Sequence, residues 1–229
     1  MFPEATSHGP MLDVCEGVRL VRGTFRMGPG MVISRTMTIV DVEGGVCVIN
    51  TVRLDAAGEA ALVKRGPVLH VIKLADGHGL DDPYYLKDGA VFWSTENAKH
   101  EKIPRGKTLA PETPIPGAKA FVLPGTSEAV VWLPNGGGTL VTCDSVQNHA
   151  DTEGASLFAR WFTPLLGFKG GVLVAAPMWR RVKKLDLAAV KGAFAPLTEL
   201  SFENLVTGHG PAIAGGADVR LREAISRLT

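Results

Sequence analysis

The stretch VLHVIKLADGHGLDDPYYL, residues 68–86, decides how the whole sequence is interpreted. Its first half is a short apolar run with turn signals at both ends, which is typical of a strand buried on both faces. Its second half places four side chains able to bind a metal ion within seven positions: Asp76, His78, Asp81 and Asp82. The stretch therefore predicts a buried strand that ends in a polar loop, and the function depends on what that loop does.

The rest of the sequence alternates between strand-like and helical patterns. Alternation and β-branched residues predict strands at 17–27, 31–42, 44–52, 67–75, 90–95, 118–125, 128–134, 138–146 and 204–213. Helical spacing predicts helices at 54–66, 155–166, 186–200 and 217–228, with Phe158, Trp161 and Phe162 assigned to the core. The proline-rich segment 97–117 is interpreted as an irregular connection.

This order of elements predicts the fold class. It favours an α/β (α+β) sandwich, in which two mixed β-sheets face each other and helices lie outside. We expect one domain over residues 1–229, with 1–11 as a loose N-terminal segment.

Composition excludes several classes of protein. The 24 Lys and Arg are balanced by 23 Asp and Glu, and no segment concentrates base, so nucleic-acid binding is not indicated. The three cysteines, Cys15, Cys47 and Cys143, are scattered, which argues against a disulfide framework and favours a reducing cytoplasm. The first ten residues lack the basic and apolar regions of a secretory signal, and no apolar stretch reaches about 18 residues, so we expect neither a signal peptide nor a membrane span. We expect a cytoplasmic protein with an unknown small-molecule substrate and no membrane partner; a homodimer stays open.

Four polar loops each follow a strand-like run, at 76–82, 124–127, 144–149 and 208–210. In α/β folds, loops at the ends of separate strands meet at one edge of a sheet and build the binding site there. These loops are therefore the candidate site.

The loops, in this order, resemble the metallo-β-lactamase-fold superfamily. The segment LVTCDSV, 140–146, is similar to the family's strand that ends in a metal-bridging Asp, here Asp144. The segment LVTGHGPAI, 205–213, followed by LREAIS, is similar to the family's C-terminal His turn, here His209. The stretch 68–86 stands in the place of the His-x-His-x-Asp-His motif. From about residue 12 to the end, the resemblance implies a four-layer αββα sandwich.

The main motif is incomplete in this chain. Its four ligand positions fall on Asp76, His78, Leu80 and Asp81, so that two of three histidines are absent. A one-residue slip would instead place Asp81 at the motif's Asp and Asp82 at its last His. Thr126 stands where the family's Gly-His turn has its His, and Thr is a poor zinc ligand. The standard dinuclear site is therefore not intact.

The remaining residues imply a reduced metal site. The resemblance implies one divalent metal ion, zinc first and iron or manganese next, bound by His78, Asp82, Asp144 and His209. It further implies catalytic carboxylates at Asp81 and Asp82, which would take a proton from water. Tyr84 and Tyr85 follow the loop directly and either contact the substrate or only pack the edge of the core, and Thr126 is a further candidate substrate contact. The implied reaction is hydrolysis of an ester, amide or phosphodiester bond.

Other interpretations of these residues stay open. Asp81-Asp82-Pro83 also fits a helix start, with an Asp cap and Pro in the first turn. His78 and His209, each between glycines, could be ordinary turn residues. The alternative function is therefore a metal-free, non-catalytic member of the fold that acts as a binding or interaction protein.

Overall fold

Two large sheets form the centre of the molecule. The computed structural model describes residues 2–99, 103 and 106–228. The first sheet has the strand order β1-β2-β3-β4-β5-β6-β7, antiparallel from β1 to β4 and parallel from β4 to β7. Its strands are β1 (His8–Cys15), β2 (Val18–Gly28), β3 (Met31–Val42), β4 (Gly45–Ile49), β5 (Val68–Lys73), β6 (Val91–Ser94) and β7 (Lys107–Thr108).

The second sheet has the order β14-β13-β10-β9-β8, in which only the β10–β13 pair is parallel. Its strands are β8 (Lys119–Val122), β9 (Ala129–Leu133), β10 (Thr139–Val141), β13 (Asn204–Val206) and β14 (Ile213–Ala214). A separate antiparallel pair is formed by β11 (Val146–His149) and β12 (Gly171–Val174).

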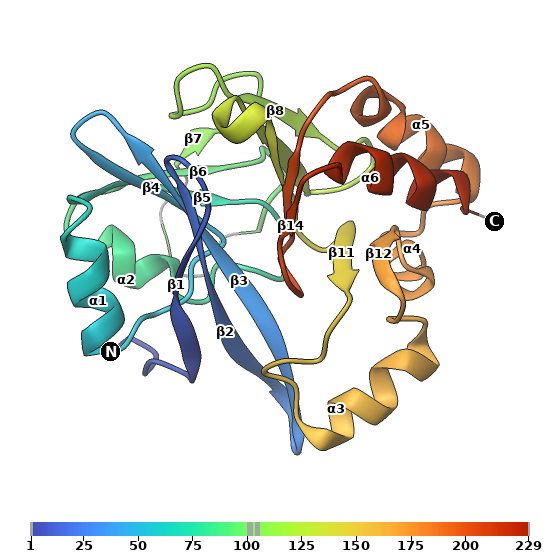
Figure 1. The fold of residues 1–229 in the computed structure, drawn as a ribbon, viewed down its shortest axis with the longest axis horizontal. Coiled ribbons are helices and arrows are strands. Elements are labelled where there is room, and N and C mark those ends of the chain that lie inside the picture. The colour runs from blue at the N-terminus through green and yellow to red at the C-terminus, as the bar shows by residue number, and fades with distance from the viewer. Residues whose placement is uncertain (1, 100–102, 104–105, 229) are drawn as a thin grey trace.

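The helices lie outside the sheets, on both sides of the molecule (Figure 1). They are α1 (Ala56–Val63), α2 (Asp82–Leu86), α3 (Leu157–Phe162), α4 (Pro177–Lys183), α5 (Leu187–Thr198) and α6 (Ala217–Ser226), with short 3-10 turns at Asn135–Gly137 and Thr163–Leu166.

Three clusters of buried apolar residues hold these layers together. One cluster lies between the sheets and joins Ile49 and Ile72 of the first to Val131 of the second. Another packs α1 and α2 on the outer face of the first sheet. The third packs α4, α5 and α6 on the outer face of the second sheet, with Phe194 fully buried. Because the hydrophobic effect stabilises each of these contacts, the layers stack as helix, sheet, sheet, helix, and the predicted αββα sandwich is confirmed.

Several elements differ from those predicted from the sequence. Strand β1 begins at His8, within the segment expected to be loose, and β7 lies in the expected irregular connection. The sequence pattern did not reveal β12 and α4, because their apolar runs are too short to show a clear period. Residues 100–102, 104 and 105 of the expected connection lie outside the described residues.

The assignment of the α3 aromatic residues to the core was wrong. Trp161 is 69% exposed and Phe158 is 48% exposed. Helical spacing shows that apolar residues share a face, but it does not show that another element covers that face.

A search of the described residues finds no helix with the length and apolar character needed to cross a bilayer.

Candidate metal centre

Three side chains from three strand ends meet at one point. His78 follows β5, Asp144 follows β10 and His209 follows β13. The Asp144 Oδ1 lies 3.2 Å from Nε2 of His78 and 3.1 Å from Nε2 of His209. The two imidazole rings stand edge to face, with centroids 5.2 Å apart. The structure therefore brings together three of the four residues expected to bind metal.

The ring of His209 is held in one orientation by the first sheet. Its Nδ1 lies 2.6 Å from the carbonyl oxygen of Ser34 on β3. A carbonyl oxygen can only accept a hydrogen bond, so Nδ1 carries the proton and Nε2 is the nitrogen turned toward Asp144. This backbone partner is of the kind that orients metal-binding histidines.

The turn that carries His209 depends on Gly210. This glycine has φ +93°, and a Cβ at this position would lie 1.5 Å from the carbonyl oxygen of Asn148. Only glycine lets the chain pass this close to β11, which explains the Gly-His-Gly sequence in structural terms.

The three ligand atoms have the spacing that a metal ion requires. Zinc binds nitrogen and carboxylate oxygen at about 2.0–2.2 Å, so neighbouring ligand atoms of a tetrahedral site lie about 3.3 Å apart. The two contacts to Asp144 Oδ1, 3.2 and 3.1 Å, are hydrogen bonds of nearly this length, and all three ligand atoms lie within 4.8 Å of one another. Among the described residues, one group of side chains could hold a metal ion, and it consists of His78, Asp144 and His209. They suffice for one ion with an open position, but not for a pair of ions.

The electrostatics of the cluster favour an ionised carboxylate. Burial alone would raise the pKa of Asp144, but the charges and hydrogen bonds of His78 and His209 hold it well below its ordinary value. Burial opposes the charged form of His209, yet its hydrogen bond to Asp144 and the charge of that carboxylate raise its pKa. Proton binding and metal binding at His209 therefore compete, and the raised pKa strengthens the competing proton.

A buried glutamate supports the backbone next to Asp144. The two carboxylate oxygens of Glu128 accept hydrogen bonds from the backbone N–H of Ser145, at 2.7 Å, and from Nε1 of Trp179, at 3.2 Å. Burial, with a contribution from the charge of Asp144, raises the pKa of Glu128 to about 8. This residue positions the Asp144 turn, and sequence analysis did not single out Glu128 because it lies inside an ordinary strand pattern.

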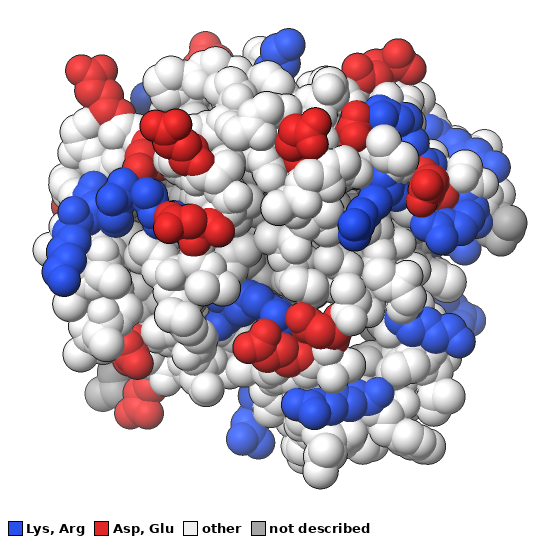
Figure 2. Space-filling view, viewed as in Figure 1, with Lys and Arg blue, Asp and Glu red and all other residues white. Residues whose placement is uncertain are grey.

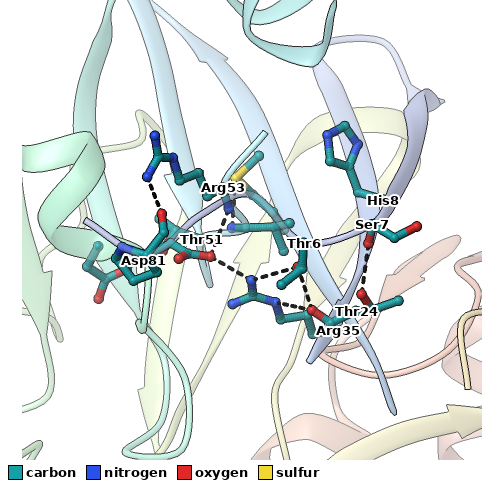
Figure 3. Close-up of polar contacts among 12 residues, drawn as sticks. Thr6, Ser7, His8, Thr24, Arg35, Thr51, Arg53 and Asp81 are labelled. Atoms are coloured by element: carbon teal, nitrogen blue, oxygen red, sulfur yellow. Dashed lines mark hydrogen bonds and ion pairs between the residues drawn. The ribbon is translucent and has the colours of Figure 1, made fainter. Parts of the chain in front are cut away.

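The two aspartates expected to be catalytic lie away from the cluster. Asp81 Oδ2 accepts hydrogen bonds from Nη2 of Arg35, at 2.6 Å, and from the backbone N–H of Arg53, at 2.8 Å (Figure 3). Asp82 Oδ1 accepts a hydrogen bond of 2.6 Å from the hydroxyl of Thr51. Both aspartate side chains are fully buried. We therefore leave Asp82 out of the ligand set that the geometry supports.

The local chain explains this orientation. The helix-start interpretation of Asp81-Asp82-Pro83 agrees with α2, which begins at Asp82 with a proline in its first turn, although Asp81 makes no side-chain cap. Gly79 has φ +92°, and a Cβ at this residue would lie 2.2 Å from Oδ2 of Asp82. The loop thus folds tightly over Asp82, and that carboxyl group faces the protein interior.

The remaining predicted residues lie at other places. The Tyr84 hydroxyl donates to Glu59, and the ring stacks against Arg53 and Lys87. Tyr85 is buried and donates to the Val52 carbonyl oxygen at 2.7 Å. Neither tyrosine is among the residues that line the cavities at the cluster.

Thr126 and Asp76 occupy two of the positions at which the resemblance expects a histidine that this chain lacks. The Thr126 hydroxyl donates to the Leu123 carbonyl oxygen at 2.8 Å, and Thr126 lines a separate open cavity with Asp76. Asp76 accepts hydrogen bonds from the Ser127 hydroxyl, at 2.6 Å, and from the backbone N–H of Lys99, at 2.8 Å. Burial raises its pKa, but these hydrogen bonds lower it overall. Asp76 therefore stabilises a loop, in the place where the family has a ligand.

Two cavities open onto the cluster. The smaller one, about 170 Å³, lies between the cluster and Arg35, with Thr51 and Leu80 in its wall. The larger one, about 430 Å³, has Asp144 and His209 at its floor. Its walls are mainly apolar and come from the β2–β3 hairpin, α3, the segment that follows α3, and α4: Met27, Met31, Ile33, Ala159, Leu166, Phe168, Met178 and Val182.

Comparisons with known proteins were made at the level of sequence and of structure. No family model and no curated protein sequence matches the chain. Among solved structures, DIM-1 metallo-β-lactamase is similar with a TM-score of 0.60 and 16% identity, covering 98% of this chain and 97% of that one.

Two further solved structures are similar over most of their length. FIM-1 metallo-β-lactamase from Pseudomonas aeruginosa has a TM-score of 0.57 and 14% identity, covering 98% of this chain and 96% of that one. A metallo-β-lactamase from Erythrobacter litoralis has a TM-score of 0.57 and 12% identity, covering 95% and 92%. The order of layers, the position of the cluster and these matches agree: the chain has the metallo-β-lactamase fold, in a form whose sequence has diverged far from the solved examples.

Proposed function

We propose that this protein is a metal-dependent hydrolase with a reduced site that holds a single divalent ion. His78, Asp144 and His209 would bind the ion, zinc first, with iron or manganese as the alternatives. The observation that carries the proposal is the spacing of the three ligand atoms, 3.1 and 3.2 Å across Asp144 Oδ1. FIM-1, one of the similar structures, is described in a mono-zinc form, so this fold has room for a single-ion arrangement.

The chain's own residues supply the remaining chemistry. When bound, a divalent ion would polarise a substrate oxygen and make a nearby water molecule more acidic. Asp144 Oδ2 makes no hydrogen bond to the described residues, and the side chain is 26% exposed toward the cavities. We assign Asp144 Oδ2 the role of accepting a hydrogen bond from the attacking water and orienting it toward the substrate.

The shape of the larger cavity bears on the substrate. Its volume, about 430 Å³, falls within the range of ordinary ligand pockets, and its walls are mainly apolar. The substrate class that fits is therefore an ester, amide or phosphodiester with a bulky apolar group. That group would lie under the β2–β3 hairpin, while the bond to be cleaved would lie over Asp144 and His209.

Metal analysis of the purified protein tests the proposal directly. We expect one equivalent of zinc after incubation with the ion and removal of excess metal. His78→Ala and His209→Ala should lose it. His149→Ala is the matched control, because His149 lines the same cavity but is not in the cluster. Its variant should retain the zinc.

The same metal analysis distinguishes the proposed hydrolase from the alternative function. A protein that gains no zinc, iron or manganese, or that loses its metal equally in the His149 variant, would overturn the proposed site. The protein would then be better described as a metal-free binding or interaction protein that uses the same fold.

A further inference from the structure

One surface of the molecule exposes an unusual number of large apolar side chains. Leu157 is 83% exposed, and Trp161, Leu165 and Val182 each exceed two thirds. All lie on α3, the 3-10 turn after it, or α4. We call the following set of exposed apolar side chains the α3–α4 surface: Leu157, Phe158, Trp161, Leu165, Met178 and Val182.

The same part of the chain carries an excess of positive charge. Residues 154–185 contain six Lys or Arg and no Asp or Glu. This local excess is not visible in the net charge of the whole chain, which is nearly balanced. Of the six, Arg160, Lys169, Arg181 and Lys184 are exposed. Figure 2 shows basic side chains around the region where Figure 1 places α4, at the right, and α3, at the lower right.

The elements of this surface lie together and border the larger cavity. Thr163 and Leu166 of the 3-10 turn and Met178 and Val182 of α4 all contribute to the wall of that cavity. At the junction, a Cβ on Gly167 would lie 3.6 Å from the ring of Pro177, the first residue of α4. The exposed apolar side chains therefore stand beside the cavity that leads to Asp144 and His209.

Exposed apolar patches of this kind usually mark an interaction site. We infer that the α3–α4 surface docks on an anionic lipid surface. Trp and Leu side chains bury themselves at the boundary between headgroups and acyl chains, and Lys and Arg contact anionic headgroups. A protein that only lies on a bilayer needs no spanning helix, so this inference is compatible with the finding that no described helix could cross a membrane.

Vesicle co-sedimentation tests this inference without any assay of hydrolysis. The probes are vesicles of phosphatidylcholine alone and of phosphatidylcholine mixed with phosphatidylglycerol, with chelator-treated protein. We expect binding to the mixed vesicles that weakens as salt rises, and much weaker binding to phosphatidylcholine. Because metal is absent, a failure here is independent of the proposed hydrolase function.

The variants separate apolar from charged contributions. The triple variant Leu157→Ser/Trp161→Ser/Leu165→Ser should lower binding to mixed vesicles at least about thirtyfold. Arg181→Gln/Lys184→Gln should lower it about tenfold and leave binding to phosphatidylcholine unchanged. All five side chains are exposed, so folding should be preserved. The matched control is Val63→Ser on α1, where an equally exposed valine lies outside the surface.

Two results would overturn the inference. One is equal vesicle binding by the triple variant and the Val63 variant. The other is an absence of vesicle binding at low salt together with a dimer that the triple variant converts to a monomer. That outcome would show that a second copy of the chain covers the surface.

Discussion

Two aspartates of the loop after β5 and the side chains of the two turns of the second sheet serve opposite purposes, while His78 of the same loop joins the turns at the cluster. In the loop, Asp81 and Asp82 are fully buried and turn toward Arg35 and Thr51. In the turns, Asp144 and His209 face two cavities. A carboxylate at the end of a strand therefore does not by itself indicate a site. The direction of its side chain decides whether it holds the fold together or remains available to a ligand.

The largest expected effect on stability comes from the buried ion pair between Asp81 of the loop and Arg35. Arg35→Met leaves Asp81 buried without its ion-pair partner, which should lower the free energy of unfolding by about 3–5 kcal/mol. Denaturant unfolding at neutral pH measures this. The double variant Arg35→Met/Asp81→Leu removes both charges and should recover most of the loss. A single variant as stable as the original protein would show that the pair does not stabilise the fold.

Zinc affinity tests whether the turns of the second sheet, unlike the buried aspartates of the loop, contribute metal ligands. His209→Ala removes a ligand and should weaken zinc binding about 100-fold or more, which corresponds to about 2.7 kcal/mol. Asp82→Asn should leave the affinity unchanged, because this side chain contacts Thr51 and is absent from the cluster. Competition with a chelating dye gives both values. Equal losses in the two variants would remove the distinction between loop and turns.

The pH dependence of stability isolates Asp82. Burial raises its pKa from 3.8 to about 6, so the folded protein binds this proton more tightly than the unfolded chain. Stability should therefore fall as pH rises from about 4 to about 6, by about 2–3 kcal/mol from this group. Asp82→Asn should abolish that part of the slope, as measured by unfolding at several pH values. A parallel pH profile in the variant would contradict the assignment.

The smallest effect on stability should come from a residue that lies in neither the loop after β5 nor the two turns of the second sheet. The Ser156 hydroxyl caps α3 and donates to the Gly30 carbonyl oxygen at the hairpin tip, at 2.7 Å. Ser156→Ala should lower the free energy of unfolding by about 1 kcal/mol and leave zinc affinity unchanged. A change in zinc affinity would mean that stability and metal binding cannot be compared separately.

The sequence revealed the fold better than it revealed the site. Strand and helix periods follow from burial on one face, and three short segments around His78, Asp144 and His209 kept the order that the family resemblance requires. Those same three residues meet in space.

What the sequence could not show was the direction of individual side chains. Asp81 and Asp82 are adjacent in a loop, and only the position of Arg35, 46 residues earlier on β3, explains why Asp81 turns inward. Trp161 shows the same limit, because its helical spacing is equally compatible with a buried and an exposed face. Contacts between distant segments decide both cases.

The anchoring of His209 to Ser34 has a mechanical consequence. His78 comes from the first sheet, Asp144 and His209 come from the second, and the His209 ring is tied back to β3 of the first. A cation bound by these three side chains would therefore link the first sheet directly to the second. Its loading should slow amide exchange at Thr36, whose N–H donates across the same seam to the Gly208 carbonyl oxygen at 2.9 Å.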